Sequence, residues 1–175
     1  MKANFAKFIN TVIHDYEGTK FEEVAGDKGG PTKFGITIYD IGIREGLNAT
    51  KHWTKLRSMV KNLTIEEAID IYKTKYWNKV KADELPSGID CVIVDFMITS
   101  GTNSVEISQV LLDLKADGKL GPKTLVALNT QDAKSFIIAF SERRRKYYKG
   151  LKQPKFDLGW QNRANKCEKY CLSII

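Results

Sequence analysis

Two carboxylates near the N-terminus of this 175-residue chain, Glu17 and Asp27, could do acid–base chemistry. Apolar residues recur at spacings of three and four from Phe5 to Tyr16, which predicts a helix that ends at Gly18. A helix C-terminus carries partial negative charge, which favours the protonated form of a carboxyl group beside it. A protonated carboxyl group is what general-acid cleavage of a glycosidic bond requires. We therefore expect Glu17 to be the acid.

Asp27 stands in a glycine-rich loop that also contains Thr32. Such a loop can fold back over the helix end, which would make Asp27 the second carboxylate of a glycosidase. Thr32 could then orient the attacking water. Glu22 and Glu23 compete for the second role, because spacing does not determine which carboxylate comes within reach of Glu17. Without chemistry, the pair would be an exposed helix-end carboxylate and a turn residue.

The composition is that of one globular domain, with 42% hydrophobic residues and a formal net charge of +7. The positive charge favours polyanions such as nucleic acid, anionic lipid headgroups or bacterial cell wall. The basic run from Arg143 to Lys146 precedes two tyrosines and could bind phosphate. We prefer an amphipathic helix whose core-facing residues are Phe136, Ile137, Phe140, Arg144 and Tyr147.

Cysteines and apolar runs indicate neither a disulfide framework nor a membrane span. The three cysteines are Cys91, Cys167 and Cys171, an odd number that favours reduced thiols, and the two histidines lie far from them in sequence. We therefore expect no metal site. Polar residues interrupt the N-terminal segment before it reaches the length of a signal-peptide core, so no Sec signal and no membrane insertion are expected.

The rest of the pattern predicts a mainly α fold with one small β-hairpin near residues 33–36. Thr37 is placed to cap a short helix through Ile41, and Thr64 forms a capping box with Glu67. Asp95 lies inside an apolar helix, which predicts a structural carboxylate that satisfies a buried backbone group or an arginine, with Arg144 and Arg163 as candidate partners. Further helices are predicted over residues 65–77, 89–98, 104–114, 122–128, 133–151 and 160–172.

Five motifs in order along the chain resemble glycoside hydrolase family 108. They are Glu17-Gly18 with Gly29-Gly30-Pro31-Thr32-Lys33-Phe34-Gly35-Ile36-Thr37; Tyr72 with Tyr76-Trp77 and Leu85-Pro86; Asp95-Phe96 with Ser100-Gly101; Asp117-Gly118-Lys119-Leu120-Gly121-Pro122-Lys123-Thr124; and Gly159-Trp160-Gln161-Asn162-Arg163. Three positions depart from the family's pattern, namely Thr19 for glycine, Lys28 for proline and Thr99 for asparagine. The loop before Thr32 is also one residue longer. None of these departures removes Glu17.

The resemblance implies an N-acetylmuramidase with a lysozyme-like, mainly α fold. Such an enzyme hydrolyses the β-1,4 bond between N-acetylmuramic acid and N-acetylglucosamine in peptidoglycan, with the residue at the position of Glu17 as the essential acid. It also implies a catalytic region over residues 1–100 and a helical peptidoglycan-binding region over 101–175, packed as one compact unit. The reaction needs no cofactor, because two carboxylates and proton transfer suffice.

Aromatic and basic side chains are candidates for contact with substrate. Phe34 and Trp77 adjoin loops and could stack on sugar rings, whereas Tyr76 fits the core stripe of its helix. Lys119 and Lys123 could meet peptide-stem carboxylates or wall phosphates. A merely solvated surface is the alternative for both lysines.

Three other functions remain open at this stage. The first is a wall-binding protein without catalysis, and the second is a lytic transglycosylase. The third is a basic regulator that binds nucleic acid, which no recognisable nucleic-acid module supports. We expect a protein that is made in the bacterial cytoplasm and acts in the periplasm or cell wall, reached through a holin or through secretion machinery.

Overall fold

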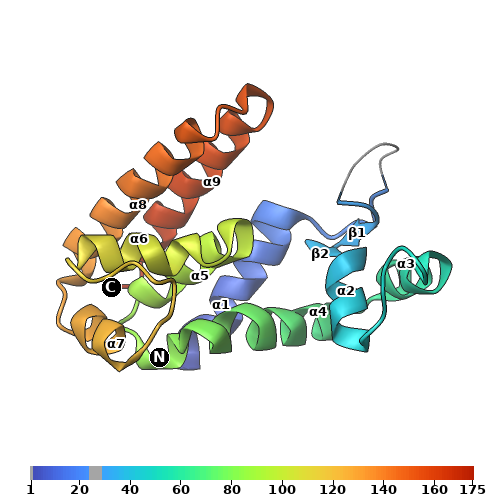
Figure 1. Cartoon of the computed structure of the whole chain (residues 1–175), viewed down its shortest axis with the longest axis horizontal. Helices are drawn as coiled ribbons and strands as arrows, with labels where there is room; N and C mark the ends of the chain where they lie inside the picture. The colour runs from blue at the N-terminus through green and yellow to red at the C-terminus, as the bar shows by residue number, and fades with distance from the viewer. Residues whose placement is uncertain (1, 24–28) are drawn as a thin grey trace. The chain divides into compact units, whose positions relative to one another are not determined.

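The computed structural model describes residues 2–23 and 29–175, and the chain is mainly α, as the sequence predicts. Its contacts form two compact units. One comprises Lys7–Tyr72, and the other comprises Lys73–Ile175 with the first six residues of the chain. Figure 1 shows the elements of each unit. In the described part of the chain, no helix is both long enough and apolar enough to span a bilayer.

The N-terminal stripe forms one helical run in two parts. Helix α1 spans Lys2–Thr11, and the wider π-helical segment η1 continues over Val12–Glu17. Gly18, with φ at +81°, ends the run as predicted. A π-helical turn is rare and occurs frequently at functional sites. Here it ends on Glu17.

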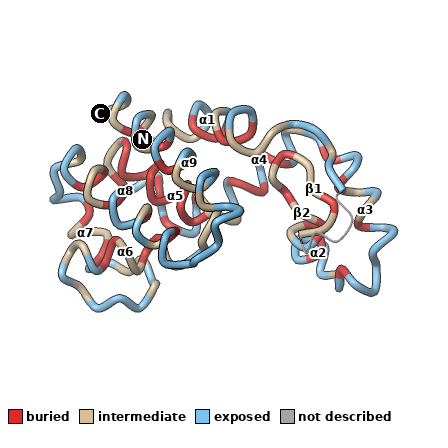
Figure 2. Tube along the Cα trace, turned by 90° about the horizontal axis from the view of Figure 1, so that it is seen from above, coloured by how far each residue is buried: buried red, intermediate tan, exposed pale blue. Residues whose placement is uncertain are grey.

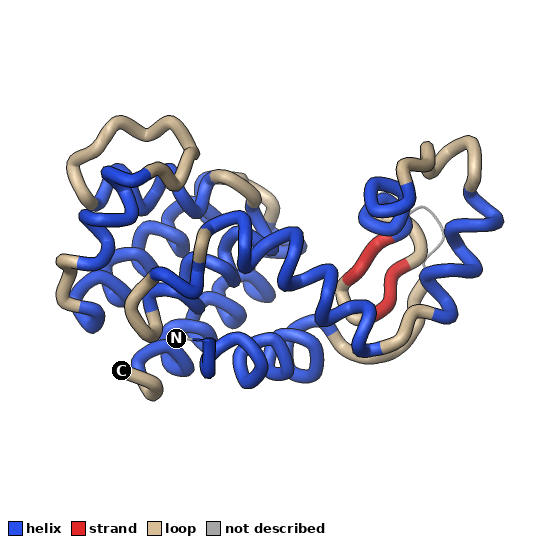
Figure 3. The backbone as a smooth tube through the Cα atoms, turned by 90° about the horizontal axis from the view of Figure 1, so that it is seen from below, coloured by secondary structure: helices blue, strands red, loops and turns tan. Residues whose placement is uncertain are grey.

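A short β-hairpin follows in the unit Lys7–Tyr72, also as predicted (Figure 3). Strand β1, Thr32–Lys33, pairs antiparallel with β2, Ile36–Thr37. Both residues of the turn between them have positive φ, 54° at Phe34 and 74° at Gly35. Two such residues in succession make the type of turn that matches the twist of a tight hairpin.

Three helices accompany the hairpin, two of them anticipated by their capping residues. Helix α2, Ile38–Glu45, begins with a capping box between Thr37 and Asp40, and α4, Ile65–Tyr72, follows the predicted pairing of Thr64 with Glu67. Helix α3, Trp53–Asn62, was not predicted. Only two of its side chains, Leu56 and Val60, are buried, so its apolar stripe is too narrow to recognise from sequence.

Lys33 links the hairpin to α3 through hydrogen bonds. The ammonium group of Lys33 donates hydrogen bonds to the carbonyl oxygens of Lys61 (3.1 Å) and Leu63 (2.8 Å), at the C-terminal end of that helix. The end of a helix leaves carbonyl groups without helical partners, and a cation there is favourable. Strand β1 is thus held to the end of α3.

The other unit is helical throughout its described elements. Short segments η2 (Lys73–Trp77), η3 (Asn78–Val80) and η4 (Ala82–Glu84) lead into helices α5 (Ile89–Ser100), α6 (Asn103–Leu111), α7 (Pro122–Asn129), α8 (Ala133–Gly150) and α9 (Pro154–Leu172). Helix α9 begins at Pro154, earlier than the predicted start near Trp160. Proline suits the first turn of a helix because its missing N–H has no helical partner there.

Helix α5 is the centre of this unit. Every residue from Ile89 to Met97 is buried, and α6, α8 and α9 pack around the helix (Figure 2). The division of the chain by its contacts therefore keeps α5 with the C-terminal helices. The predicted catalytic region over residues 1–100 and peptidoglycan-binding region over 101–175 stay a prediction.

A buried ionic cluster joins three of these helices. The carboxylate of Asp95 on α5 meets Arg144 of α8 at 2.6 Å and Arg163 of α9 at 2.9 Å. Asp95 and Arg144 are fully buried, which confirms the structural role predicted for Asp95. Arg144 also donates to the hydroxyl of Tyr148, at 3.1 Å. Tyr148 rather than the predicted Tyr147 completes the buried stripe of α8.

Candidate active site

Glu17 lies against the turn of the β-hairpin. It is half-buried and is the last residue of η1. A Cβ atom placed on Gly35 would lie 2.7 Å from Cγ of Glu17 and 2.8 Å from its Cδ. Both distances are shorter than real carbon atoms allow. The carboxyl group therefore occupies space that is open only because residue 35 is glycine.

Tyr72, at the end of α4, approaches the same turn. Its hydroxyl donates a hydrogen bond to the carbonyl oxygen of Phe34, at 2.9 Å. The hydroxyl oxygen is also 2.5 Å from the position of a Cβ on Gly35. Tyr72 and Glu17 thus flank one glycine. From sequence, Tyr72 was placed only in a helix stripe and a family motif, because no local spacing relates it to residue 35.

Thr32 lies on strand β1 of the same hairpin. Its backbone pairs with that of Glu22 in both directions, at 2.8 and 2.9 Å. Its hydroxyl donates to the carbonyl oxygen of Gly30 at 3.0 Å. Because the hydroxyl proton is used in that bond, the lone pairs of the oxygen could still accept a hydrogen bond from water. The hairpin thus carries Thr32 on one strand and, at its turn, the glycine against which Glu17 packs.

The candidates for the second carboxylate are Asp27, Glu22 and Glu23. Asp27 lies outside the described residues. Glu23 is bound by the guanidinium group of Arg57 through hydrogen bonds of 2.9, 2.9 and 2.5 Å. Hydrogen bonding to Arg57 lowers the pKa of Glu23. Glu22 and Glu23 are both exposed, and the bidentate pairing with Arg57 makes Glu23 a weaker alternative to Asp27.

The two aromatic candidates are buried. Trp77 is fully buried, packs edge-on against Phe5 at 5.2 Å and donates from its indole nitrogen to Asp83 at 3.1 Å. A buried ring cannot stack on a sugar, so the structure does not support the predicted role of Trp77. Tyr76, predicted to pack in the core, is the half-buried neighbour. Phe34 retains 9% exposure, with the ammonium group of Lys33 5.1 Å from its ring centre.

The two predicted lysines do not share a unit with Glu17. Lys119 and Lys123 belong to the other unit, where both are exposed at the rim of a hollow of about 700 Å³.

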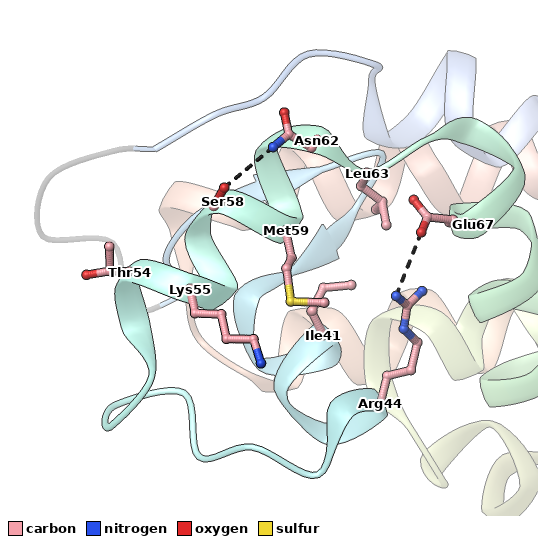
Figure 4. Close-up of a pocket in the computed structure, with 9 residues that line it drawn as sticks. All are labelled: Ile41, Arg44, Thr54, Lys55, Ser58, Met59, Asn62, Leu63 and Glu67. Carbon is pink, nitrogen blue, oxygen red and sulfur yellow. Dashed lines mark hydrogen bonds and ion pairs between the residues drawn. The ribbon is translucent and has the colours of Figure 1, made fainter.

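A second hollow, of about 560 Å³, opens between α2, α3 and α4 (Figure 4). The basic groups of Arg44 and Lys55 are at its rim, and Arg44 lies 3.9 Å from Glu67 across it. Its remaining lining residues are Ile41, Thr54, Ser58, Met59, Asn62 and Leu63. Of the predicted catalytic residues that the structure describes, neither Glu17 nor Thr32 lines this hollow, so the chemistry is better assigned to the surroundings of Glu17.

Comparison with known proteins identifies the family of the chain. The family model described as Glycosyl hydrolase 108 matches residues 10–101, which include η1, the hairpin and α4. The chain belongs to the glycosyl hydrolase 108 family. The resemblance seen in the sequence is thereby confirmed, and the protein is a glycoside hydrolase.

Further matches extend over the rest of the hydrolase. A second family model, described as a predicted peptidoglycan domain, matches residues 103–165. The solved structure of SagA from Brucella abortus is similar with a TM-score of 0.85 and 33% identity, covering 99% of this chain and 96% of the SagA chain. Among curated proteins, the comparison finds no match. Together the two family models support a peptidoglycan hydrolase of the muramidase class.

Proposed function

We propose that this hydrolase is an N-acetylmuramidase that cleaves the β-1,4 bond between N-acetylmuramic acid and N-acetylglucosamine, with Glu17 as the general acid. The observation that carries the proposal is the packing of the Glu17 carboxyl group against Gly35, at the turn of a hairpin that also carries Thr32. A catalytic acid must be held in one geometry relative to the bond that it protonates.

In the proposed reaction, Glu17 gives its proton to the glycosidic oxygen as the bond from that oxygen to the muramic acid C1 breaks. Asp27 is proposed to take a proton from a water molecule that attacks C1 from the opposite face. The oxygen of Thr32 accepts a hydrogen bond from this water. Attack by water inverts the configuration at C1, whereas attack by the carboxylate itself would retain it.

We further propose peptidoglycan as the partner, and the cell wall or periplasm as the place of action. Access to the wall would come through a holin or through secretion machinery. The matched peptidoglycan domain supports the choice of partner.

The products of digestion test the proposal. Purified peptidoglycan is treated with the wild-type protein, reduced with borohydride and analysed by mass spectrometry. We expect fragments that end in reduced N-acetylmuramic acid. Reduced N-acetylglucosamine ends would show that a different bond is cleaved. Anhydro ends, which form without water, would identify a lytic transglycosylase instead.

A further inference from the structure

A preformed hollow lies at the loop that joins α6 to α7. Figure 1 shows the course of this loop between the two helices. Its volume is about 700 Å³. Residues of α6, of the loop and of the first turn of α7 line it. All of them belong to the unit formed mainly by Lys73–Ile175, and they lie within the segment that matches the peptidoglycan domain.

The side chain of Gln109 holds the loop in place through hydrogen bonds. Its side chain is 2% exposed, and its amide nitrogen donates to Asp117 (2.8 Å), to the carbonyl of Lys119 (3.0 Å) and to Thr124 (3.2 Å). Its amide oxygen accepts hydrogen bonds from the backbone N–H groups of Asp117 (2.9 Å) and Gly118 (3.0 Å). One buried amide thus satisfies five groups of the loop and α7, so the hollow has a fixed shape without a ligand.

The rim of the hollow carries an excess of positive charge. Lys115, Lys119 and Lys123 line it, and all three are exposed. Asp117 is the acidic residue of the lining. One oxygen of its carboxylate accepts hydrogen bonds from Gln109 and from the backbone N–H of Lys119, so it already has partners in the loop. Three ammonium groups against one carboxylate favour an anionic ligand.

An apolar strip continues from the basic rim. Leu114, Pro122 and Lys123 line both this hollow and an adjoining one of about 440 Å³, which Val126 and Ala127 complete. Val126 is 64% exposed. None of the described residues that line either hollow is aromatic, so the surface offers no stacking platform for sugar rings.

The two adjoining hollows together form one groove, with lysines at its rim and an apolar strip beside them. We propose that this groove binds the stem peptides of peptidoglycan rather than its glycan strands. Stem peptides combine free carboxylates with alanine methyl groups, which match the three lysines and the apolar strip respectively. The inference rests on the proposed function, since it assumes that peptidoglycan is the substrate. It adds that the C-terminal helices recognise the peptide, while the surroundings of Glu17 act on the sugar.

The test is binding of a fluorescently labelled stem peptide with free carboxylates, measured by anisotropy at low salt. We expect the double variant Lys119→Ala and Lys123→Ala to bind about tenfold more weakly, which corresponds to about 1.4 kcal/mol. Amidation of the peptide carboxylates should weaken its binding to the wild-type protein to a similar degree. The matched control is Lys166→Ala with Lys169→Ala, which removes the same charge from exposed positions on α9 and should bind as the wild type does.

Unchanged binding by the Lys119 and Lys123 double variant, with its circular dichroism and thermal unfolding like those of the wild type, would overturn the inference. Equal binding of free and amidated peptides would overturn it as well. Tighter binding of a DNA oligonucleotide, lost in the same double variant, would assign the groove to nucleic acid instead. Digestion of peptidoglycan by the wild-type protein is scored separately, so a protein that cleaves but binds no peptide contradicts only this inference.

Discussion

Gly35 provides the space in which the carboxyl group of Glu17 lies. A side chain at residue 35 would come within 2.8 Å of the Glu17 carboxyl carbon and within 2.5 Å of the Tyr72 hydroxyl. Residue 35 also has φ at +74°, a conformation that residues other than glycine rarely adopt. The hairpin turn and the end of the first helical run therefore pack against each other at Gly35, where only a glycine leaves enough space.

Replacing Gly35 by alanine should displace the acid. We expect Gly35→Ala to lower the rate of peptidoglycan cleavage on the order of 100-fold, because a shift of about 1 Å in a catalytic group has effects of this size. The added methyl group and the positive φ should also destabilise the protein by about 1–2 kcal/mol or more. Turbidity clearance of a peptidoglycan suspension measures the first effect, and urea unfolding measures the second.

Gly46→Ala is the matched control for this variant. Gly46 has φ at +65°, but a Cβ there would meet no atom within 4 Å. It should therefore carry the backbone strain without displacing any group and retain nearly full activity. Equal loss of activity in the two variants would show that strain, and not the position of Glu17, explains the effect.

Tyr72→Phe should loosen the hairpin turn without changing the shape of the core. The variant leaves the carbonyl of Phe34 without the hydrogen bond from the tyrosine hydroxyl, which typically costs about 1–3 kcal/mol when the group is buried. We expect a lower free energy of unfolding and a lower kcat, with little change in KM. Tyr39→Phe, at a side chain that is 44% exposed, should change neither quantity. A Tyr72→Phe protein with wild-type stability and kcat would contradict this role.

The buried ionic cluster should be costly to break. Asp95→Asn leaves Arg144 and Arg163 without their carboxylate, and losing one partner of a buried ion pair typically costs about 3–5 kcal/mol. Glu168→Gln removes a more exposed pairing, with Arg145, and should cost about 1 kcal/mol or less. Urea unfolding at neutral pH compares the two variants. Similar losses would mean that burial of the cluster adds nothing to its stability.

Asp95 should also make the wild-type protein sensitive to acid. Burial raises the pKa of Asp95, but Arg163 and Arg144 outweigh that effect and hold it below its usual value. A carboxyl group with a lowered pKa in the folded state stabilises the fold above its unfolded pKa of about 3.9. This stability is lost as the pH falls through the folded value. The unfolding free energy of the wild type should therefore fall more steeply than that of Asp95→Asn below about pH 4. Parallel curves would contradict the assignment.

Much of the fold was predictable because local signals and burial agree. The apolar run around Asp95 indicated both the central helix and the pairing of Asp95 with arginine, and Thr64 with Glu67 marked the start of α4. Tyr76 and Trp77 show where the apolar stripe of the helix that begins at Ile65 could not be continued at regular helical spacing. The helix widens into the π-helical segment η2 after Tyr72, which shifts the register of the stripe and buries Trp77 instead of Tyr76.

The site was predictable only in part. Glu17 could be placed at a helix end because Gly18 is a strong stop signal. Its contact with Gly35 and the nearby hydroxyl of Tyr72 depend on the packing of three segments that are far apart in sequence. No periodicity or spacing along the chain specifies which residues of these segments come together, so only the structure shows the contact.

The central claim is that Glu17 is the catalytic acid, and Glu17→Gln tests it most directly. Release of soluble fragments from purified peptidoglycan is measured for the wild type, for Glu17→Gln and for Glu66→Gln, a control at an exposed glutamate of α4. Removing a general acid typically costs a factor of about 10²–10⁴ in rate. We expect such a loss in Glu17→Gln with unchanged thermal unfolding, and wild-type rates in Glu66→Gln. A folded Glu17→Gln protein that cleaves as fast as the wild type would contradict the account.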